Sequence, residues 1–186
     1  MTPKKDNSWL MPPRIKILEA LGTIADKRIE ISGNRAKVIS STSKSQILTV
    51  QEIHQNSPAQ KNCKQFSVLR NRKISDMKEK TYAVTFDGKN SITCNDNGSY
   101  YKGYLGYPSI AFLMLKGILP FNEKLAEALK GIKWKELNEK FKDYSKVEQI
   151  IKIKIAREKV KQNQVDEFVS KVIEKLKELE LKKLDF

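Results

Sequence analysis

The sequence contains very few of the residues from which metal sites and thiol chemistry are built. Its 186 residues include two cysteines and one histidine. Cys63 and Cys94 are far apart and neither belongs to a CxxC pair, whereas a zinc site needs several Cys or His ligands at short spacing. We therefore predict that the protein holds no metal and no cofactor.

Signatures of catalysis are also missing. His54 lies in a polar stretch with no patterned third residue that would complete a catalytic triad with either thiol. No Walker A or dinucleotide-binding glycine motif occurs. Asp87 and Asp96 are each explained by turn chemistry, in DGKN and NDNG. We predict that the protein is not an enzyme.

Long apolar runs are absent. No stretch approaches the roughly 18 apolar residues of a membrane-spanning helix, and the opening MTPKKDNSWLMPP has lysines but no apolar segment of a secretory signal. The C-terminal part carries both charge signs in near balance, which is unlike a helix that lies on a membrane. We expect a cytoplasmic protein without a membrane partner.

The sequence is rich in positive charge. It has 36 Lys and Arg residues against 22 Asp and Glu residues, a net charge of +14. Such a surplus attracts polyanions, although a solvated lysine-rich face of the kind found in heat-adapted proteins is an equal alternative. Charge alone therefore favours nucleic acid as a partner without establishing it.

Residues 92–108, ITCNDNGSYYKGYLGYP, hold four of the six tyrosines together with a lysine and three glycines. A buried phenol needs a hydrogen-bond partner, whereas flat rings near cations suit the stacking of nucleobases. Tyr107 directly precedes Pro108 and an apolar helix, so we expect it in the core. Tyr100, Tyr101 and Tyr104 are the candidates for base stacking.

Periodicity predicts an α+β domain. Residues 13–25 have helical spacing with a proline in the first turn. The segments RIEI, AKVIS and QILTV then predict a three-stranded meander, and TYAVTF, DGKN and SITCN predict a hairpin. One face of the strand 81–86 carries Tyr82, Val84 and Phe86, which favours a core face over a stacking platform. An apolar helix follows Tyr107, and Asn122 caps the next one.

The last part of the chain differs in kind. No glycine or proline occurs from Ser145 to Phe186, and Ser145 with Glu148 forms a predicted capping box, so a long helix, bent or broken near residue 162, begins there. We predict an α+β domain over residues 1–144, with an antiparallel β-sheet packed against helices. A helical extension with a short coiled-coil-like stripe follows over residues 145–186. The stripe consists of Val165, Phe168, Val169, Val172, Leu176 and Leu179.

This stripe has two interpretations. The helix either folds back onto its own domain or pairs with a second copy of itself, and helical spacing does not separate them. Because the preceding segments already supply the apolar residues of a core, self-association is the favoured interpretation. We therefore expect a homodimer held by the C-terminal helix.

The order of elements resembles the ThermoDBP family, the single-stranded DNA-binding proteins of thermophilic archaea. The resemblance rests on PRIKILEALGTIADKR, the antiparallel strands, the GYLGYPSIAFLMLKG passage and the zipper-like C-terminal helix. It implies a compact domain whose cleft takes a single strand, with dimerisation through the C-terminal helix. The segment 82–115 is also similar in layout to a SWIM domain, but only Cys94 matches a zinc ligand there, so a zinc-less unit is implied.

The resulting hypothesis is a protein that binds single-stranded nucleic acid with little sequence preference, by backbone charge and aromatic stacking. DNA is favoured and RNA is open, because charge and stacking serve both. The alternative is a structural or protein-interaction module of a nucleic-acid-associated complex. The predicted nucleic-acid contacts are Arg28, Arg35, Lys37, Arg70, Arg72, Lys73, Tyr82, Tyr100, Tyr101, Lys102 and Tyr104.

Overall fold

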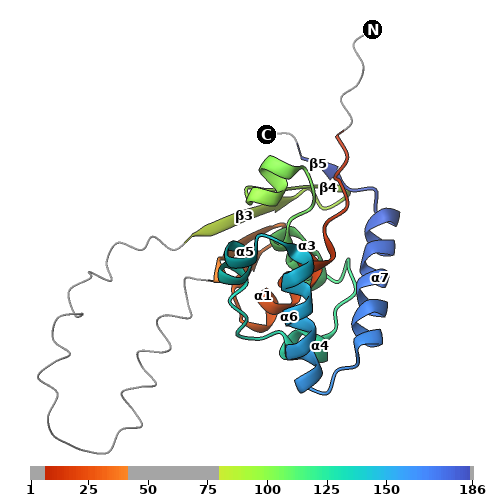
Figure 1. Cartoon of the computed structure of the whole chain (residues 1–186). Helices are drawn as coiled ribbons and strands as arrows, with labels where there is room; N and C mark the ends of the chain where they lie inside the picture. Colours follow the sequence, from red (N-terminus) through yellow and green to blue (C-terminus); the bar gives the residue numbers. More distant parts are fainter. Residues whose placement is uncertain (1–6, 42–79, 185–186) are drawn as a thin grey trace, which may run out of the picture.

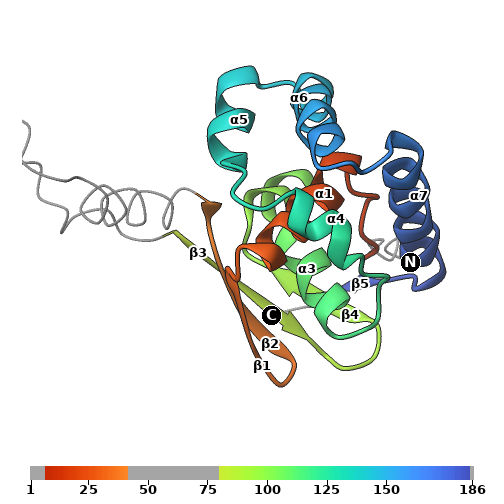
Figure 2. The ribbon, with the colours of Figure 1, turned by 90° about the horizontal axis from the view of Figure 1, so that it is seen from below.

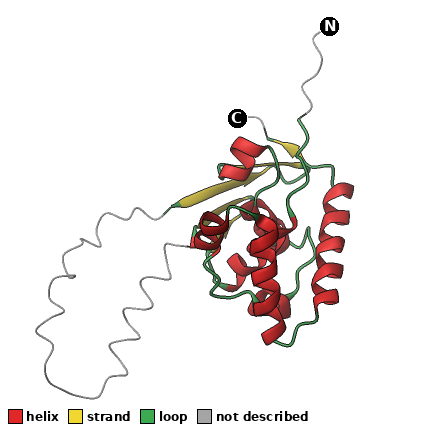
Figure 3. Cartoon of the chain, in the orientation of Figure 1, coloured by secondary structure: helices red, strands yellow, loops and turns green. Residues whose placement is uncertain are grey.

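A computed structural model of the chain describes residues 7–41 and 80–184. Within that part, a five-stranded sheet is packed against helices, which confirms the predicted α+β class (Figure 3). The predicted strand QILTV lies outside the described residues, as do Arg70, Arg72 and Lys73.

The sheet has the strand order β1-β2-β3-β4-β5. Its first four strands are antiparallel neighbours, and β3 and β4 form the predicted hairpin. The hairpin turn is held by Asp87, whose Oδ1 accepts hydrogen bonds from the backbone N–H of Lys89 at 2.8 Å and of Ser91 at 2.9 Å. This confirms the turn role predicted for Asp87. The strands are β1 (Ile29–Ser32), β2 (Arg35–Ile39), β3 (Thr81–Phe86), β4 (Ser91–Cys94) and β5 (Lys182–Lys183).

The prediction of an antiparallel sheet is wrong for the fifth strand, which makes the sheet mixed. β5 pairs in parallel with β4, with Ser91 opposite Lys182 and Ile92 opposite Lys183. All the helices after β4 separate these two strands in the sequence, and a long crossover of this kind is what a parallel pair requires. The indole N–H of Trp9 reaches the same place, donating to the carbonyl oxygen of Lys182 at 3.1 Å.

Helices cover one face of the sheet. The first two are α1 (Arg14–Ala25), which starts after Pro13 as predicted, and α3 (Tyr107–Leu115). α3 contacts both the sheet and α1, and α4 (Glu123–Ala128) packs beside α1 (Figure 2). Ile110 and Phe112 on α3 are fully buried, so α3 forms the centre of the core. The side chain of Asn122 caps α4 by accepting from the N–H of Leu125 at 2.9 Å, as predicted.

The two faces of the sheet differ in polarity. Along β2, Ala36 and Val38 are buried under the helices, whereas Arg35 and Lys37 alternate with them and are exposed. Side chains of successive residues in a strand point to opposite faces. Arg35 and Lys37 therefore project from the face that is opposite to the helices.

Three more helices lie between α4 and β5. α5 (Trp134–Phe141) buries Trp134, with Leu137 and Phe141 packed against the core. α6 (Tyr144–Arg157) starts one residue before the predicted Ser145, because Asp143 and not Ser145 is the N-cap; Asp143 accepts from the N–H of Ser145 at 2.9 Å. α7 (Gln162–Glu178) follows after a break, which confirms the break expected near residue 162.

The stripe predicted to dimerise is buried in the chain's own core. Val165, Phe168, Val169, Val172 and Leu176 all belong to the same buried cluster as α1 and α3, and Leu179 packs against it. α7 lies along the side of the helical layer (Figure 1), where Asp166 pairs with Arg14 of α1. The fold-back interpretation is therefore the one that the structure realises. Buried residues on both sides of position 144 form one cluster, so α6 and α7 help to complete the core.

Candidate functional site

A cleft of about 500 Å³ opens where β3, α1, α5, the start of α6 and the segment 96–104 meet. Five of the six tyrosines of the chain line it. We call it the tyrosine cleft. These residues are Tyr82, Tyr101, Tyr104, Tyr107 and Tyr144.

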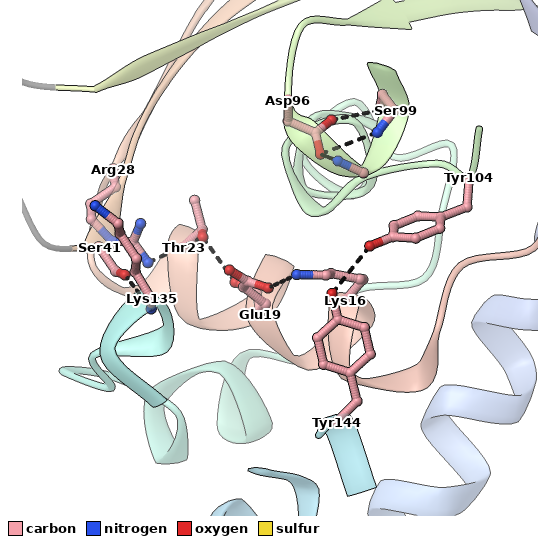
Figure 4. A network of polar contacts seen from close by, with 11 residues as sticks. Lys16, Glu19, Thr23, Arg28, Ser41, Asp96, Ser99, Tyr104, Lys135 and Tyr144 are labelled. Atoms are coloured by element: carbon pink, nitrogen blue, oxygen red, sulfur yellow. Dashed lines mark hydrogen bonds and ion pairs between the residues drawn. The ribbon is translucent and has the colours of Figure 1, made fainter. Parts of the chain in front are cut away.

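Four of the five tyrosines come from separate elements, and Tyr104 lies in the segment between η3 and α3. Tyr82 is on β3, Tyr107 begins α3 and Tyr144 begins α6, while Tyr101 lies in η3, a single π-helical turn over Gly98–Lys102. The rings of Tyr82 and Tyr107 meet edge to face at 6.1 Å between centroids. The hydroxyls of Tyr104 and Tyr144 lie 3.3 Å apart (Figure 4). The tertiary fold thus collects aromatic rings that are dispersed in the sequence.

A buried ion pair lies in the same cleft. The ammonium of Lys16 donates to Oε2 of Glu19 at 2.7 Å, one turn further along α1, and both side chains are almost inaccessible (Figure 4). The Lys16 ammonium also lies 5.1 Å from the ring centroid of Tyr144 and 5.8 Å from that of Tyr107. Burial lowers the pKa of Lys16, but the attraction of Glu19 outweighs it, and the pKa is raised above 10.5. Lys16 is therefore a cation at neutral pH.

Asp96 organises the turn that carries Tyr101 and Tyr104. Its buried carboxylate accepts from the backbone N–H of Gly98 at 2.9 Å and from the hydroxyl of Ser99 at 2.5 Å. A Cβ at Gly106 would collide with this carboxylate, so the chain approaches it at a residue without a side chain. The turn role predicted for Asp96 is confirmed, and the same carboxylate also lines the cleft.

Lysines surround the aromatic rings. Lys80 precedes β3, Lys102 ends η3 and Lys135 is in the first turn of α5, and all three line the cleft. Lys80 and Lys102 are exposed. The ammonium of Lys80 lies 5.4 Å from the ring centroid of Tyr82. The cleft therefore combines flat rings with accessible positive charge.

Three phenols of the cleft hold their protons tightly. Burial raises the pKa of Tyr82 to about 12, and the neighbouring charge of Asp96 adds to the rise. Burial also raises the pKa of Tyr104, with a further contribution from its hydrogen bond to Tyr144, and raises that of Tyr107 well above its ordinary value. These three side chains are neutral at physiological pH, and they offer rings and hydroxyls instead of phenolates.

We expect these phenols to delay the alkaline titration of the native protein. An unfolded tyrosine has a pKa of 10.0, whereas burial raises the pKa of Tyr82 to about 12 in the native protein. The stability that this difference contributes is fully present below pH 10 and is lost as the pH rises toward 12. Ultraviolet absorbance of ionised tyrosine, followed with pH in the native and denatured chain, measures the delay. Coincident curves would contradict the burial of the three rings, and Tyr82→Phe should narrow the gap between them.

The predicted contacts divide into several groups. Tyr82, Tyr101, Lys102 and Tyr104 are brought together in the cleft. Tyr100 lies beside them on η3, with its ring 4.8 Å from that of Tyr101. Tyr107 is buried, as predicted, although one side of it lines the cleft. The remaining described residues of the prediction, Arg28, Arg35 and Lys37, lie elsewhere.

Arg28 does not fit the predicted role of a phosphate contact. It is only 2% exposed, and its guanidinium donates to the carbonyl oxygen of Ile39 at 2.8 Å and to Asp26 at 3.2 Å. It also donates to the hydroxyl of Thr23 at 3.2 Å (Figure 4). Arg28 therefore joins the end of α1 to the end of β2. Arg35 and Lys37 are exposed, but on the face of the sheet that is opposite to the helices.

Sequence reasoning missed Lys16, Glu19 and Tyr144. Lys16 and Glu19 interrupt the apolar pattern of residues 13–25, and a charged pair at this spacing within an apolar helix was the available signal. Tyr144 had no comparable signal, because nothing near it in the sequence relates it to residues 82–107.

Within residues 7–41 and 80–184, no group of three or more His, Cys, Asp or Glu residues is arranged to hold a metal ion. None of the described helices is long and apolar enough to cross a membrane. Burial raises the pKa of Cys94, so its sulfur is a protonated thiol inside the core. The candidate site is therefore the aromatic and lysine-lined cleft.

Fold and site together define a small α+β protein with a tyrosine-lined, cationic cleft. The chain belongs to the family described as "Uncharacterised conserved protein UCP014422", whose model matches residues 9–67 and 60–182. No curated protein and no solved structure matches the chain. The family match carries no link to the ThermoDBP proteins, and that resemblance stays a hypothesis.

Proposed function

We propose that the protein binds single-stranded nucleic acid by placing at least one base in the tyrosine cleft. The observation that carries this proposal is the convergence of five tyrosines and several lysines on one cleft. Base stacking on an aromatic ring contributes about 1 to 3 kcal/mol per base. The volume of about 500 Å³ lies within the range of small-molecule sites, and it suits a nucleotide.

The charge around the cleft suits a phosphate backbone. Lys16 is neutralised by Glu19 inside the protein, so the cations that meet phosphates are those nearer the surface. Lys80 and Lys102 are exposed, and the 3.8 Å pair of Lys135 with Glu139 is open to solvent, where a phosphate can compete with the carboxylate. A single strand can present its base to the rings while its phosphates follow these lysines. A duplex keeps its bases stacked inside, so it would need to be opened first. The proposal therefore favours single strands over duplexes.

The neutral phenols favour binding over catalysis. Tyr82, Tyr104 and Tyr107 have raised pKa values, so none of them supplies a phenolate base at neutral pH. The carboxylate of Asp96 is engaged with the backbone and with Ser99. Base stacking needs only neutral aromatic rings, so these phenols serve it without any change of protonation.

Binding should depend strongly on salt. We expect a fluorescent oligothymidylate of about 12 nucleotides to bind at low salt, with log K falling against log salt by about 0.7 for each neutralised phosphate. Replacing Lys80, Lys102 and Lys135 together by glutamine should reduce the slope by about 2, because three phosphate contacts are lost. Fluorescence anisotropy over a salt series measures both quantities.

Arg35→Gln with Lys37→Gln is the matched control, since these exposed cations lie on the opposite face of the sheet. It should leave the slope nearly unchanged. No binding of the unaltered protein at low salt would refute the proposal. If the control variant lowers the slope of log K against log salt by the same amount, the strand binds on the other face of the sheet.

A further inference from the structure

The tyrosine cleft contains hydrogen-bonding groups that stacking and phosphate contact do not require. Lys16 and Glu19 form an ion pair that is nearly inaccessible to solvent yet borders the cleft. A buried ion pair loses hydration that its mutual attraction only partly recovers, so it is weak evidence for stability. At the wall of the tyrosine cleft, the pair instead holds a cation and a carboxylate in fixed positions beside a bound ligand.

A third polar residue lines the same cleft and carries an acceptor without a hydrogen-bond partner. The side-chain oxygen Oδ1 of Asn138, on α5, is buried and accepts no hydrogen bond from any described residue, and Asn138 lines the cleft. An unsatisfied buried acceptor costs about 1 to 3 kcal/mol. A ligand with a hydrogen-bond donor would remove this cost.

Glu19 and Asn138 therefore offer hydrogen-bond acceptors, and Lys16 offers a cationic donor. The side-chain oxygens of Glu19 have further lone pairs besides the one that accepts from the ammonium of Lys16. Lys16 has three N–H donors, and one of them is used by Glu19. Two other carboxylates line the cleft, and both already have partners: Asp96 accepts from the turn of η3, and Glu139 pairs with Lys135.

Nucleobases differ in the edge that they would offer to these groups. Guanine has two neighbouring donors, the N1–H and the 2-amino group, next to one acceptor, O6. Thymine and uracil have a single donor between two acceptors, which would set a carbonyl oxygen against a carboxylate. Adenine and cytosine each offer one amino group. Guanine is therefore the base whose edge matches an excess of acceptors beside a cation.

We propose that the tyrosine cleft prefers guanine, with Glu19 accepting from the N1–H and 2-amino donors and Lys16 donating to O6. Asn138 supplies a second acceptor for the amino group. This inference rests on the proposed function, because it assigns the base that the same cleft takes. The sequence predicted binding with little sequence preference, whereas this inference predicts a preference for guanine at one position of the strand.

The unaltered protein allows a test that needs no substitution. We use oligothymidylates of about 12 nucleotides in which one central thymine is replaced by guanine, hypoxanthine, adenine or cytosine. A single guanine per strand avoids guanine-rich structures. Guanine should bind at least about tenfold more tightly than thymine, and hypoxanthine, which lacks the 2-amino group, should lose most of that gain. Anisotropy competition gives the ratios.

Glu19→Gln tests the assignment of the carboxylate, since glutamine keeps the size but places an amide N–H₂ near the donors of guanine. Its guanine-to-thymine ratio should fall to about one, with the plain oligothymidylate measured on the same variant as the reference strand. Glu127→Gln is the matched control, because Glu127 is an exposed carboxylate on α4 paired with Lys130. It should keep the guanine preference.

The outcomes separate the two proposals. Equal binding of all five strands by the unaltered protein would overturn the guanine inference and leave single-strand binding standing. A guanine preference that survives in a folded Glu19→Gln protein would overturn the role of Glu19. Failure to bind any strand at low salt would refute the proposed function itself. Circular dichroism establishes that each variant is folded before its ratio is used.

Discussion

Replacing Val172 by aspartate is expected to unfold the protein or bring it close to unfolding. Val172 is fully buried in α7, within the core cluster that includes α1 and α3. An aspartate there would lose apolar packing and bury a carboxylate without a partner, at a cost of about 4 kcal/mol or more. Small domains have a total stability of about 5 to 15 kcal/mol. Urea unfolding followed by circular dichroism measures the loss.

The same experiment distinguishes the two interpretations of the α7 stripe. Lys171→Asp places the same residue one position earlier on an exposed site of the helix, and it should cost less than about 1 kcal/mol. Light scattering should show that neither substitution turns a dimer into a folded monomer. A dimeric parent protein and a well-folded monomeric Val172→Asp variant would restore the zipper interpretation.

Replacing Tyr101 and Tyr144 together by alanine should weaken single-strand binding by roughly a hundredfold. Both rings line the tyrosine cleft and both are partly open to solvent, with Tyr101 74% and Tyr144 40% exposed. Two lost stacking contacts at about 1.4 kcal/mol each give this factor. Exposed side chains are replaced at little cost in stability, so the loss should appear in the dissociation constant while the melting temperature changes little.

Tyr100→Ala is a closely matched control for this variant. Tyr100 neighbours Tyr101 on η3 and is 75% exposed, but it does not line the cleft. It should change the dissociation constant by less than about threefold, a difference below 1 kcal/mol. If Tyr100→Ala weakens binding as much as the double variant, the bases stack on the outer face of η3 and the cleft is not their site.

Local features of the fold were predictable from the residues. Proline followed by apolar residues at helical spacing marked α1, Asn122 marked the start of α4, and alternation around DGKN marked the hairpin of β3 and β4. Each depends on neighbours within a few positions. The parallel pairing of β5 was not predictable in this way, because it joins residues that are distant in the chain and β5 has only two residues.

The candidate site was predictable only in part, and the reason is the same. Tyr101, Lys102 and Tyr104 are close in the sequence, so their clustering was visible. Arg28 was predicted to contact phosphate because a basic residue between a helix and a strand is usually exposed. In the fold its side chain is buried, and the carbonyl oxygen of Ile39 and the hydroxyl of Thr23 accept its hydrogen bonds. Lys16 and Glu19 are an ordinary charged pair of a helix in the sequence, and only the fold brings the rings of Tyr107 and Tyr144 to the Lys16 ammonium.

The sequence by itself determined the basic character of this protein, its main helices and its hairpin, since charge and periodicity are properties of short segments. The tertiary structure decided where those segments meet. It turned the C-terminal stripe into core, placed Arg35 and Lys37 on the opposite side of the sheet, and gathered five tyrosines around a buried ion pair. Burial and side-chain contact depend on packing between distant segments, and no local pattern encodes them.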